Sequence, residues 1–311
     1  MMDKLRMVYT MKKFPEKIDF YFFRCYDMGR KGDLGMKKIL ASFMMIGLVF
    51  CLGACNLPWQ KKEDEKEEKK QVVEASKVRG TMEGMTLKVG VSNEMAPFSY
   101  YDSNEKKIVG FDIDILEKIS EYLGFDYDLY PMAMAEIEKK IKNGELDLAV
   151  AGISITDERQ KQFAFTDSYY ETYLQIVVNK STLIAERKEI QGKVIGVETG
   201  TSNAEYAQDY MSDQNTIKYY TSMKKLFKDL EAGKIDATIY DAPGVEKYLE
   251  DHKDQTNLIA LEEKLNSEES NYGIMFAKGY KYLDQFNVAL QVLNTDGNYQ
   301  KIKETWLKSE E

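Results

Sequence analysis

A run of small, hydroxyl-bearing and charged residues between Gly152 and Arg159 has the composition and spacing of an anion receptor. The apolar segment 148–153 is typical of a short buried strand, and its glycine permits a close backbone approach. Thr156 is suited to cap a following helix, which would place Arg159 one turn inside it. The Ser154 hydroxyl, free amides and the guanidinium would then meet at the strand end. Such a group could bind a carboxylate.

The same residues also fit a strand followed by an ordinary surface helix. In that interpretation Arg159 is solvated or paired with Asp157 or Glu158. The local pattern alone leaves both interpretations open.

The wider sequence resembles a known family. The runs AGISITDER and FTDSYY, between Ala151 and Tyr170, are similar to the core motif of the extracellular solute-binding proteins of polar amino-acid ABC transporters. The sequences of these two runs are most similar to those of the glutamine-binding members. The run GFDIDI at 110–115 resembles the family's other signature. The resemblance covers roughly Thr86 to Leu307.

Strands alternate with helices from Thr86 onward, which indicates an α/β fold with a mainly parallel sheet. The resemblance implies a two-lobed, periplasmic-binding-protein-like fold of type II. Each lobe would be a mixed, mainly parallel sheet flanked by helices, and a two-segment hinge would join the lobes. The expected boundaries are 86–178 and 272–311 for lobe 1, 182–270 for lobe 2, and Tyr173–Val178 and Asn271–Phe276 for the hinge.

The second lobe carries candidate ligand-binding residues of its own. Gly200, followed by Thr201 and Ser202 at a helix start, is an anion-binding geometry, although a simple helix cap has the same pattern. Asp241 ends a strand, where open α/β sheets bind ligands, although a turn before Ala-Pro also fits. In the resembled family the Gly-Thr segment holds the substrate carboxylate opposite the arginine, and this aspartate pairs with the ammonium.

The resemblance therefore implies a pocket for a free L-amino acid between two closing lobes. The expected ligand-binding residues are Ser92, Met95, Met134, Ala151, Gly152, Ser154, Arg159, Glu198, Thr201, Ser202, Tyr240 and Asp241. Several depart from the glutamine-binding pattern: Met95 and Met134 replace aromatic residues, Glu198 a lysine and Tyr240 a histidine. Ser92 stands where many members have an acid. Glu198 could favour a cationic or amide side chain, or it could point to solvent.

Composition and residue types exclude several function classes. A formal net charge of −9 argues against a nucleic-acid surface. The single histidine, His252, lies in a charged segment, and the sequence shows no nucleophile–base pair or metal-ligand cluster. Asp112 and Asp114 lack the further oxygen ligands of an EF-hand calcium loop and suit a helix N-terminus. We therefore expect no catalysis, no metal site and no cofactor.

The amino-terminal region resembles a bacterial lipoprotein signal. A basic Met36-Lys37-Lys38 precedes the apolar run 39–52, and Leu52-Gly53-Ala54-Cys55 is similar to a lipobox. The apolar run is shorter than the ~20 residues needed to span a bilayer. The resemblance implies a signal peptide at 36–54 and a lipidated Cys55 carrying diacylglycerol and a further acyl chain such as palmitate. An uncleaved anchor or a chance apolar run is the alternative.

The interpretation of the remaining amino-terminal residues follows from the predicted lipoprotein signal. Residues 1–35 would be an over-extended start rather than part of the mature protein, although an unusually long basic region also fits. Residues 55–85, with the charge run KKEDEKEEKK, would form a flexible tether. No cysteine follows Cys55, so we expect no disulfide in the domain.

Together these features predict a lipid-anchored substrate-binding component of an ABC importer at the extracytoplasmic face of the bacterial membrane. We expect a monomer that captures an L-amino acid and delivers it to a permease and its ATPase. An amino-acid sensor without transport and a dehydratase-like enzyme on the same fold are the alternatives.

Overall fold

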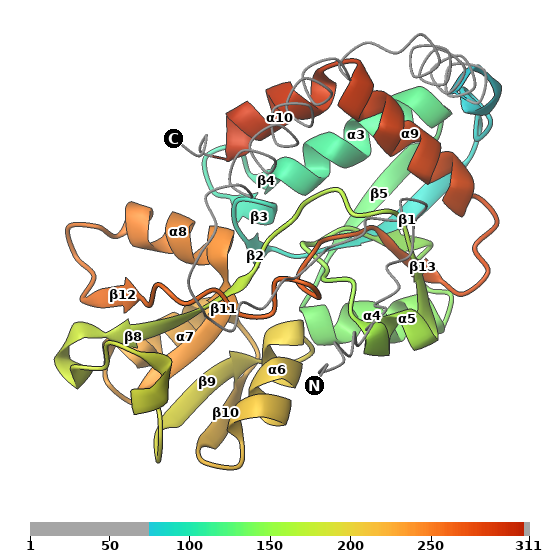
Figure 1. The fold of residues 1–311 in the computed structure, drawn as a ribbon. Helices are drawn as coiled ribbons and strands as arrows, with labels where there is room; N and C mark the ends of the chain where they lie inside the picture. The colour runs from blue at the N-terminus through green and yellow to red at the C-terminus, as the bar shows by residue number, and fades with distance from the viewer. Residues whose placement is uncertain (1–74, 308–311) are drawn as a thin grey trace, which may run out of the picture. The chain divides into compact units, whose positions relative to one another are not determined.

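The computed structural model describes residues 75–307 (Figure 1). The predicted signal peptide, the Cys55 lipidation site and the charged run lie outside the described residues. The end of the expected tether is described, and it belongs to the folded domain. Met82 is fully buried, and its N–H donates to the Leu123 carbonyl. The expected tether boundary at residue 85 is therefore too late, because the apolar Met82 side chain packs into the first lobe.

The first lobe is built on a five-stranded sheet with the order β5-β1-β6-β13-β7. Strand β1 pairs in parallel with β5 and β6, and β13 runs antiparallel to β6 and β7. The strands are β1 (Thr86–Val91), β5 (Asp126–Pro131), β6 (Leu148–Ala149), β7 (Phe163–Phe165) and β13 (Met275–Ala277). A small ribbon adds β2 (Glu94–Met95), β3 (Ser99–Asp102) and β4 (Lys107–Val109).

Helices cover both faces of this sheet (Figure 1). They are α3 (Phe111–Leu123), α9 (Leu283–Thr295) and α10 (Asn298–Trp306) on one side, and α4 (Met134–Lys142) and α5 (Asp157–Gln162) on the other. Successive side chains of a strand point to opposite faces of the sheet, so one strand packs against helices on both sides. Leu148 and Val150 join the cluster that contains α3 and α9, whereas Ala149 and Ala151 join the cluster under α4. A run that is buried on both faces must be apolar throughout, as Leu148–Ile153 is.

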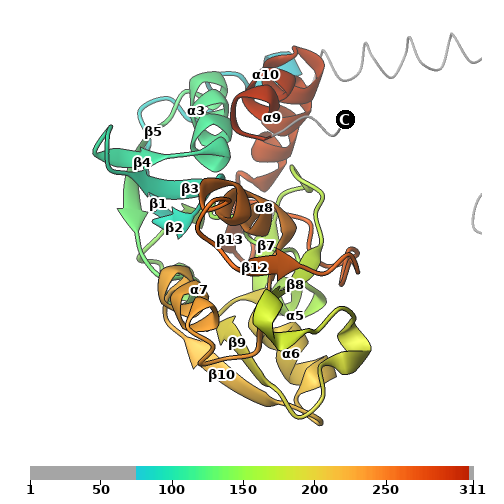
Figure 2. The same ribbon diagram turned by 90° about the vertical axis from the view of Figure 1, so that its left-hand side faces the viewer.

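The second lobe has its own five-stranded sheet, with the order β10-β9-β11-β8-β12. Strand β9 is parallel to β10 and β11, and β8 is antiparallel to β11 and β12. The elements are β8 (Leu174–Asn179), η1 (Lys180–Thr182), η2 (Arg187–Glu189), β9 (Val194–Glu198), α6 (Ser202–Met211), β10 (Thr216–Tyr220), α7 (Met223–Glu231), β11 (Ala237–Asp241), α8 (Ala242–Asp251) and β12 (Leu258–Ala260). In Figure 2, α3, α9 and α10 lie together in the first lobe, and α6 and α7 lie in the second.

The first crossing between lobes differs from the expected one. Tyr173–Val178 was expected to be a hinge segment of the first lobe, but β8 begins at Leu174 and pairs with β11 along its length. Leu174, Ile176, Val177 and Val178 are apolar because the strand occupies an interior position of the second sheet. The chain returns between Leu265, which bridges Leu174, and Tyr272, which bridges Ser154.

The two mixed α/β lobes agree with the fold class expected from the sequence. Within residues 75–307, each helix is too short or too polar to cross a lipid bilayer.

Candidate functional site

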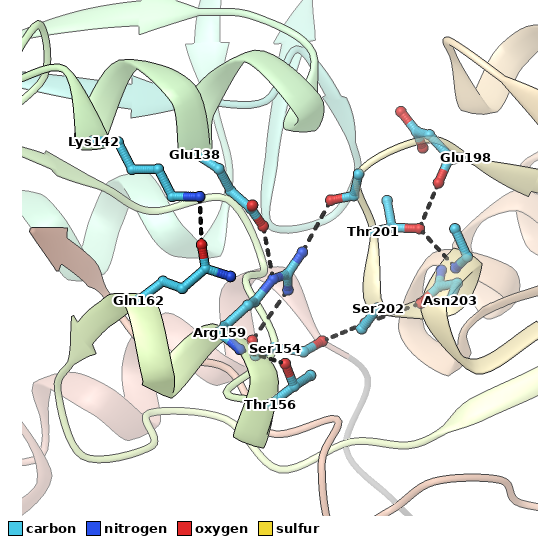
Figure 3. Close-up of polar contacts among 12 residues, drawn as sticks. Glu138, Lys142, Ser154, Thr156, Arg159, Gln162, Glu198, Thr201, Ser202 and Asn203 are labelled. Atoms are coloured by element: carbon cyan, nitrogen blue, oxygen red, sulfur yellow. Dashed lines mark hydrogen bonds and ion pairs between the residues drawn. The ribbon is translucent and has the colours of Figure 1, made fainter. Parts of the chain in front are cut away.

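Arg159 is held at the start of α5, and it is only 3% exposed. Thr156 caps this helix as predicted, because its Oγ1 accepts the Arg159 N–H at 3.2 Å. The guanidinium donates from Nη1 to the Ser154 carbonyl at 3.1 Å, so it turns back over the strand end. It also donates from Nε to Glu138 Oε1 on α4 at 3.0 Å (Figure 3). The solvated alternative, and pairing with Asp157 or Glu158, are therefore not what the structure shows.

Glu138 is a partner of Arg159 that the sequence did not predict. It lies 21 positions before Arg159 in the sequence, on a different helix, so no local spacing signals the pair. A guanidinium carries five N–H donors, and bonds to α4, the Ser154 carbonyl and the second lobe use three of them. The remaining two are sufficient for a bidentate contact with a carboxylate.

The two lobes touch beside Arg159. Its Nη2 donates to the Gly200 carbonyl of the second lobe at 3.0 Å, and the Ser154 and Ser202 hydroxyls lie 2.9 Å apart (Figure 3). Gly200 has a φ of +80°, and a Cβ there would lie 2.7 Å from the Cα of Ala135 on α4. Glycine is required here both by backbone conformation and by the close approach of the lobes.

Thr201 is the N-cap of α6. Its Oγ1 accepts the Ala204 N–H at 3.3 Å and donates its own proton to the Glu198 carbonyl at 2.7 Å. The helix-cap interpretation is thus correct for this side chain. Because the cap also places Ser202 and the first amides of α6 at the interface of the lobes, it is compatible with a ligand-binding role.

Asp241 lies at the end of β11 with its side chain 5% exposed. It is the N-cap residue of α8, but its carboxylate makes no capping bond. Instead Oδ1 accepts the Tyr272 hydroxyl at 2.8 Å, and Oδ2 accepts the Asn203 amide at 3.0 Å. Burial raises the pKa of Asp241, while these two bonds and the Arg159 charge oppose the rise. A desolvated carboxylate with two neutral donors is a suitable partner for a cation.

Tyr272 and Asn203 were also not identified from the sequence. Tyr272 lies in the expected return segment of the hinge and is fully buried against Phe98. Asn203 directly follows Ser202. Both residues contact Asp241 from distant positions in the chain, so no local sequence pattern predicts these contacts. Their nearness to elements that were predicted is the only sequence feature that could have pointed to them.

Acidic and apolar side chains also meet at the site. The Tyr240 hydroxyl lies 3.5 Å from Glu198 Oε2 and 3.6 Å from Met95 Sδ. Burial raises the pKa of Glu198 to about 7, and the charges of Glu94 and Asp241 add to the increase. Glu94 is a further residue that the sequence analysis did not identify.

These side chains face one small cavity between the lobes. It is lined by Ser92, Glu94, Met95, Met134, Gly152, Ser154, Arg159, Glu198, Thr201, Ser202, Tyr240 and Asp241. Every predicted residue except Ala151 is in this set. Ala151, expected to offer a backbone carbonyl to the ammonium, is not among the lining residues, and its side chain packs into the cluster under α4, whereas the neighbouring Gly152 does line the cavity. Gly152 lines it with a φ of +55°, where a Cβ would lie 2.8 Å from Met95 Cε.

The two acids at the start of α3 anchor other elements. Asp112 is fully buried and accepts the Gly152 N–H and the Tyr169 hydroxyl, each at 2.7 Å. Burial raises the pKa of Asp112 to about 7. Asp114 accepts the indole N–H of Trp306 at 2.6 Å. Asp112 therefore positions a backbone segment of the cavity, a role that its expected place at a helix N-terminus did not predict. Among residues 75–307, no group of three or more His, Cys, Asp or Glu is arranged to hold a metal ion.

Comparison with known proteins identifies the family. The sequence profile of the bacterial extracellular solute-binding proteins, family 3, matches residues 87–309. The chain belongs to this family. Its solved neighbours also confirm that the fold of this solute-binding protein is of the type II periplasmic amino-acid-binding class.

Three relatives of this solute-binding protein show the range of the family. It is 31% identical over 236 residues to ABC transporter arginine-binding protein 1 of Escherichia coli (strain K12), and the matched region covers 75% of this chain and 95% of the relative. It is 28% identical over 286 residues to the ABC transporter glutamine-binding protein GlnH of Bacillus subtilis (strain 168), covering 88% and 99%. A structure described as an ancestral arginine-binding protein bound to arginine matches with a TM-score of 0.67 and 32% identity, covering 74% and 100%. Arginine-binding relatives thus match at least as well as the glutamine-binding relative.

Proposed function

We propose that this solute-binding protein captures a free L-amino acid with a cationic side chain, such as L-arginine, for an ABC importer. The observation that carries the proposal is that Arg159 of the first lobe and Asp241 of the second face the same cavity. A free amino acid presents a carboxylate and an ammonium a few ångströms apart. Buried charges need partners of opposite sign, and these two residues supply them.

The remaining cavity residues favour a positively charged side chain. Glu94 and Glu198 line the cavity together with Asp241, whereas its one cation, Arg159, is already bonded to Glu138. Met95 and Met134 add flexible apolar walls suited to a chain of methylene groups. A zwitterion with one extra positive charge complements this surplus of carboxylates, and the arginine-binding relatives are consistent with it.

Anchoring and delivery complete the proposal. Lipid on Cys55 would hold the domain at the extracytoplasmic face of the membrane, where two or more acyl chains give stable attachment. The protein would work as a monomer and present its ligand-bound form to a permease and its ATPase. Since ligand contacts come from both lobes, the ligand stabilises the closed form, and a permease can recognise that form.

A binding screen tests the proposal. The protein, expressed from the full-length sequence in a bacterial host that processes lipoproteins and purified in mild detergent, is heated with each common L-amino acid in turn, and binding is then measured by calorimetry. L-Arginine or L-lysine should give the largest rise in melting temperature, since a ligand at 1,000 times its Kd stabilises the folded state by about 4 kcal/mol. Mass spectrometry of the same material should find an acylated Cys55 at the amino terminus.

Variants assign the binding to the cavity. Arg159→Ala and Asp241→Ala should each abolish measurable binding. Arg187→Ala is the matched control, because Arg187 pairs with Glu263 on the surface of the second lobe and does not line the cavity. Unchanged binding in Arg159→Ala, or no response to any amino acid, would contradict the proposed function.

A further inference from the structure

A second cavity lies between the lobes, away from the one that contains Arg159 and Asp241. It has a volume of about 460 Å³ and is lined by the crossing segment 168–173, by α10 of the first lobe and by α8 of the second. We call it the rear cavity, and the one with Arg159 and Asp241 the front cavity. The two share no lining residue. Small-molecule sites commonly have volumes of about 300–1,000 Å³ and are frequent at domain interfaces, so the rear cavity has the size and the place of such a site.

The chain crossing between the lobes separates the two cavities. Tyr272 forms one backbone bridge with Ser154 and another with Tyr170. Ser154 lines the front cavity, whereas Tyr170 lines the rear one. At the start of α8 the division is the same, because Asp241 lines the front cavity and Ala242 the rear one. A rotation about the crossing that separates the lobes at the front therefore brings them together at the rear.

Aromatic rings and carboxylates line the rear cavity together. Tyr299 and Trp306 are partly buried aromatic residues of α10. Glu171 belongs to the crossing segment, and Glu246 and Glu250 lie one turn apart on α8. Aromatic faces attract cations, and quaternary ammonium ligands are recognised in this way. The combination of residue types is suited to an organic cation.

The balance of charge in the rear cavity also favours a cation. Its three glutamates outnumber its two lysines, Lys247 and Lys303. Lys247 pairs with Asp251, which does not line the cavity. A positively charged ligand with an apolar surface therefore complements both the charge and the aromatic walls.

Hydrogen bonds connect the two cavities through buried residues. The Tyr299 hydroxyl donates to the Tyr169 carbonyl, and the Tyr169 hydroxyl donates to Asp112 Oδ1, each at 2.7 Å. Both tyrosines line the rear cavity. Asp112 Oδ2 accepts the N–H of Gly152, which lines the front cavity. A ligand that orders the two tyrosines thus acts on the carboxylate that holds Gly152 in place.

We propose that the rear cavity binds a small alkylated ammonium ion, and that this ion and the amino acid strengthen each other's binding. The second half of this inference rests on the proposed function, whereas binding of the ion does not. A ligand that contacts α8 and α10 stabilises the present arrangement of the lobes, in which Ser154 and Ser202 also meet. Coupling between two sites is reciprocal, so each ligand should raise the affinity for the other by the same factor.

Choline provides the probe for the rear cavity. Its control is the neutral alcohol of the same shape in which carbon replaces the quaternary nitrogen. In calorimetry on the purified protein without amino acid, choline should bind with a Kd below about 1 mM. The alcohol should bind about tenfold more weakly, because it lacks the charge that the carboxylates and aromatic faces attract. Asp241→Ala should retain choline binding, since Asp241 lines only the front cavity.

Charge-removing variants assign choline to the rear cavity. Glu171→Gln/Glu246→Gln/Glu250→Gln removes three exposed carboxylates, so the fold should be retained. Choline affinity should fall about tenfold, while arginine affinity without choline should not change. The matched control removes three exposed carboxylates of the first lobe that line neither cavity, and it should bind choline normally. It is the variant Glu105→Gln/Glu121→Gln/Glu304→Gln.

Arginine titrations with and without saturating choline measure the coupling. Choline should raise arginine affinity about fivefold or more in the unaltered protein, and much less in the variant of the rear cavity at the same choline concentration. The site is overturned if choline does not bind, if the alcohol binds equally well, or if the variant of the rear cavity keeps its choline affinity. Equal arginine affinity with and without choline overturns the coupling. If the proposed function itself fails, no amino acid binds and the coupling falls with it, but choline binding still decides the site.

Discussion

The cavity of this protein contains ionised or ionisable groups that are almost fully withdrawn from water. Arg159 and Asp241 each have less than a tenth of their surface exposed; Arg159 donates two of its hydrogen bonds to Glu138 and the Ser154 carbonyl, and Asp241 accepts two from Tyr272 and Asn203. Such bonds fix the orientation of the side chains before a ligand arrives, and so reduce the entropy that binding must remove. Asp112 contributes indirectly, because it holds the backbone of Gly152 at the cavity.

Arginine affinity should rise with pH up to neutrality. Burial, assisted by the Glu94 and Asp241 charges, raises the pKa of Glu198 to about 7, so below that pH the free protein holds a proton there. A cationic side chain favours the ionised form and displaces the proton. Affinity should increase by at most about tenfold per pH unit below pH 7 and level off above it. Calorimetry between pH 5.5 and 8.5, in buffers of different ionisation enthalpy, measures both affinity and proton release.

Glu198→Gln should flatten this profile and abolish proton release near neutrality. The other groups facing Glu198 are Glu94 on β2, and Tyr240 and Asp241 on β11, and they remain in the variant. The same slope in the variant as in the unaltered protein would show that a different group titrates.

At the level of elements, the site depends on where helix ends and turns meet. The turn before α6 brings Gly200 against Ala135 at the start of α4, and it brings the Gly200 carbonyl to Arg159. Helix α4 also supplies Glu138 and Met134. One helix therefore supplies a cavity wall, an acid that orients Arg159 and a surface that the second lobe contacts.

Gly200→Ala should weaken ligand binding about tenfold or more by holding the lobes apart. The new Cβ would lie 2.7 Å from the Ala135 Cα, and the φ of +80° adds roughly 1–2 kcal/mol of strain. Gly233→Ala is a matched control, because Gly233 has a φ of +66° in the same lobe with no atom within 4 Å of its Cβ position. Both variants should lose similar stability in urea, but only Gly200→Ala should lose affinity and closure. Equal affinity in the two variants would contradict this account.

At the scale of the whole domain, the contacts between lobes concentrate around the cavity. The two serine hydroxyls, the Arg159 to Gly200 bond and the Tyr272 to Asp241 bond all join the first lobe or the returning chain to the second lobe. The residues proposed to bind the ligand thus also join the lobes, which is the condition for ligand binding to control lobe closure.

A disulfide should lock this closed form. The Ser154 and Ser202 hydroxyl oxygens are 2.9 Å apart, so cysteines at these two positions would bring their thiols together. In a Ser154→Cys/Ser202→Cys variant, oxidation in the presence of arginine should form the bond and slow arginine release by orders of magnitude. Reduction should restore rapid release, as measured by loss of labelled ligand on dilution. Unchanged release after complete oxidation would show that the ligand does not leave by separation of the lobes.

The sequence by itself determined the features that depend on neighbours along the chain. The Thr156 cap and the buried strand beginning at Leu148 follow from local propensity and alternation. Together with the family resemblance, these were sufficient to predict nearly all the residues that line the cavity.

Only the tertiary structure decided which distant groups meet. The pairing of Glu138 with Arg159 and the two donors to Asp241 join separate elements or separate lobes, and Glu94 and Glu198 line one cavity from different lobes. The same holds for β8, whose apolar sequence suits either sheet and whose place is set by its partners β11 and β12. Hydrogen bonds and charges act through space, so residues far apart in the chain give no local signal of the contacts they will make.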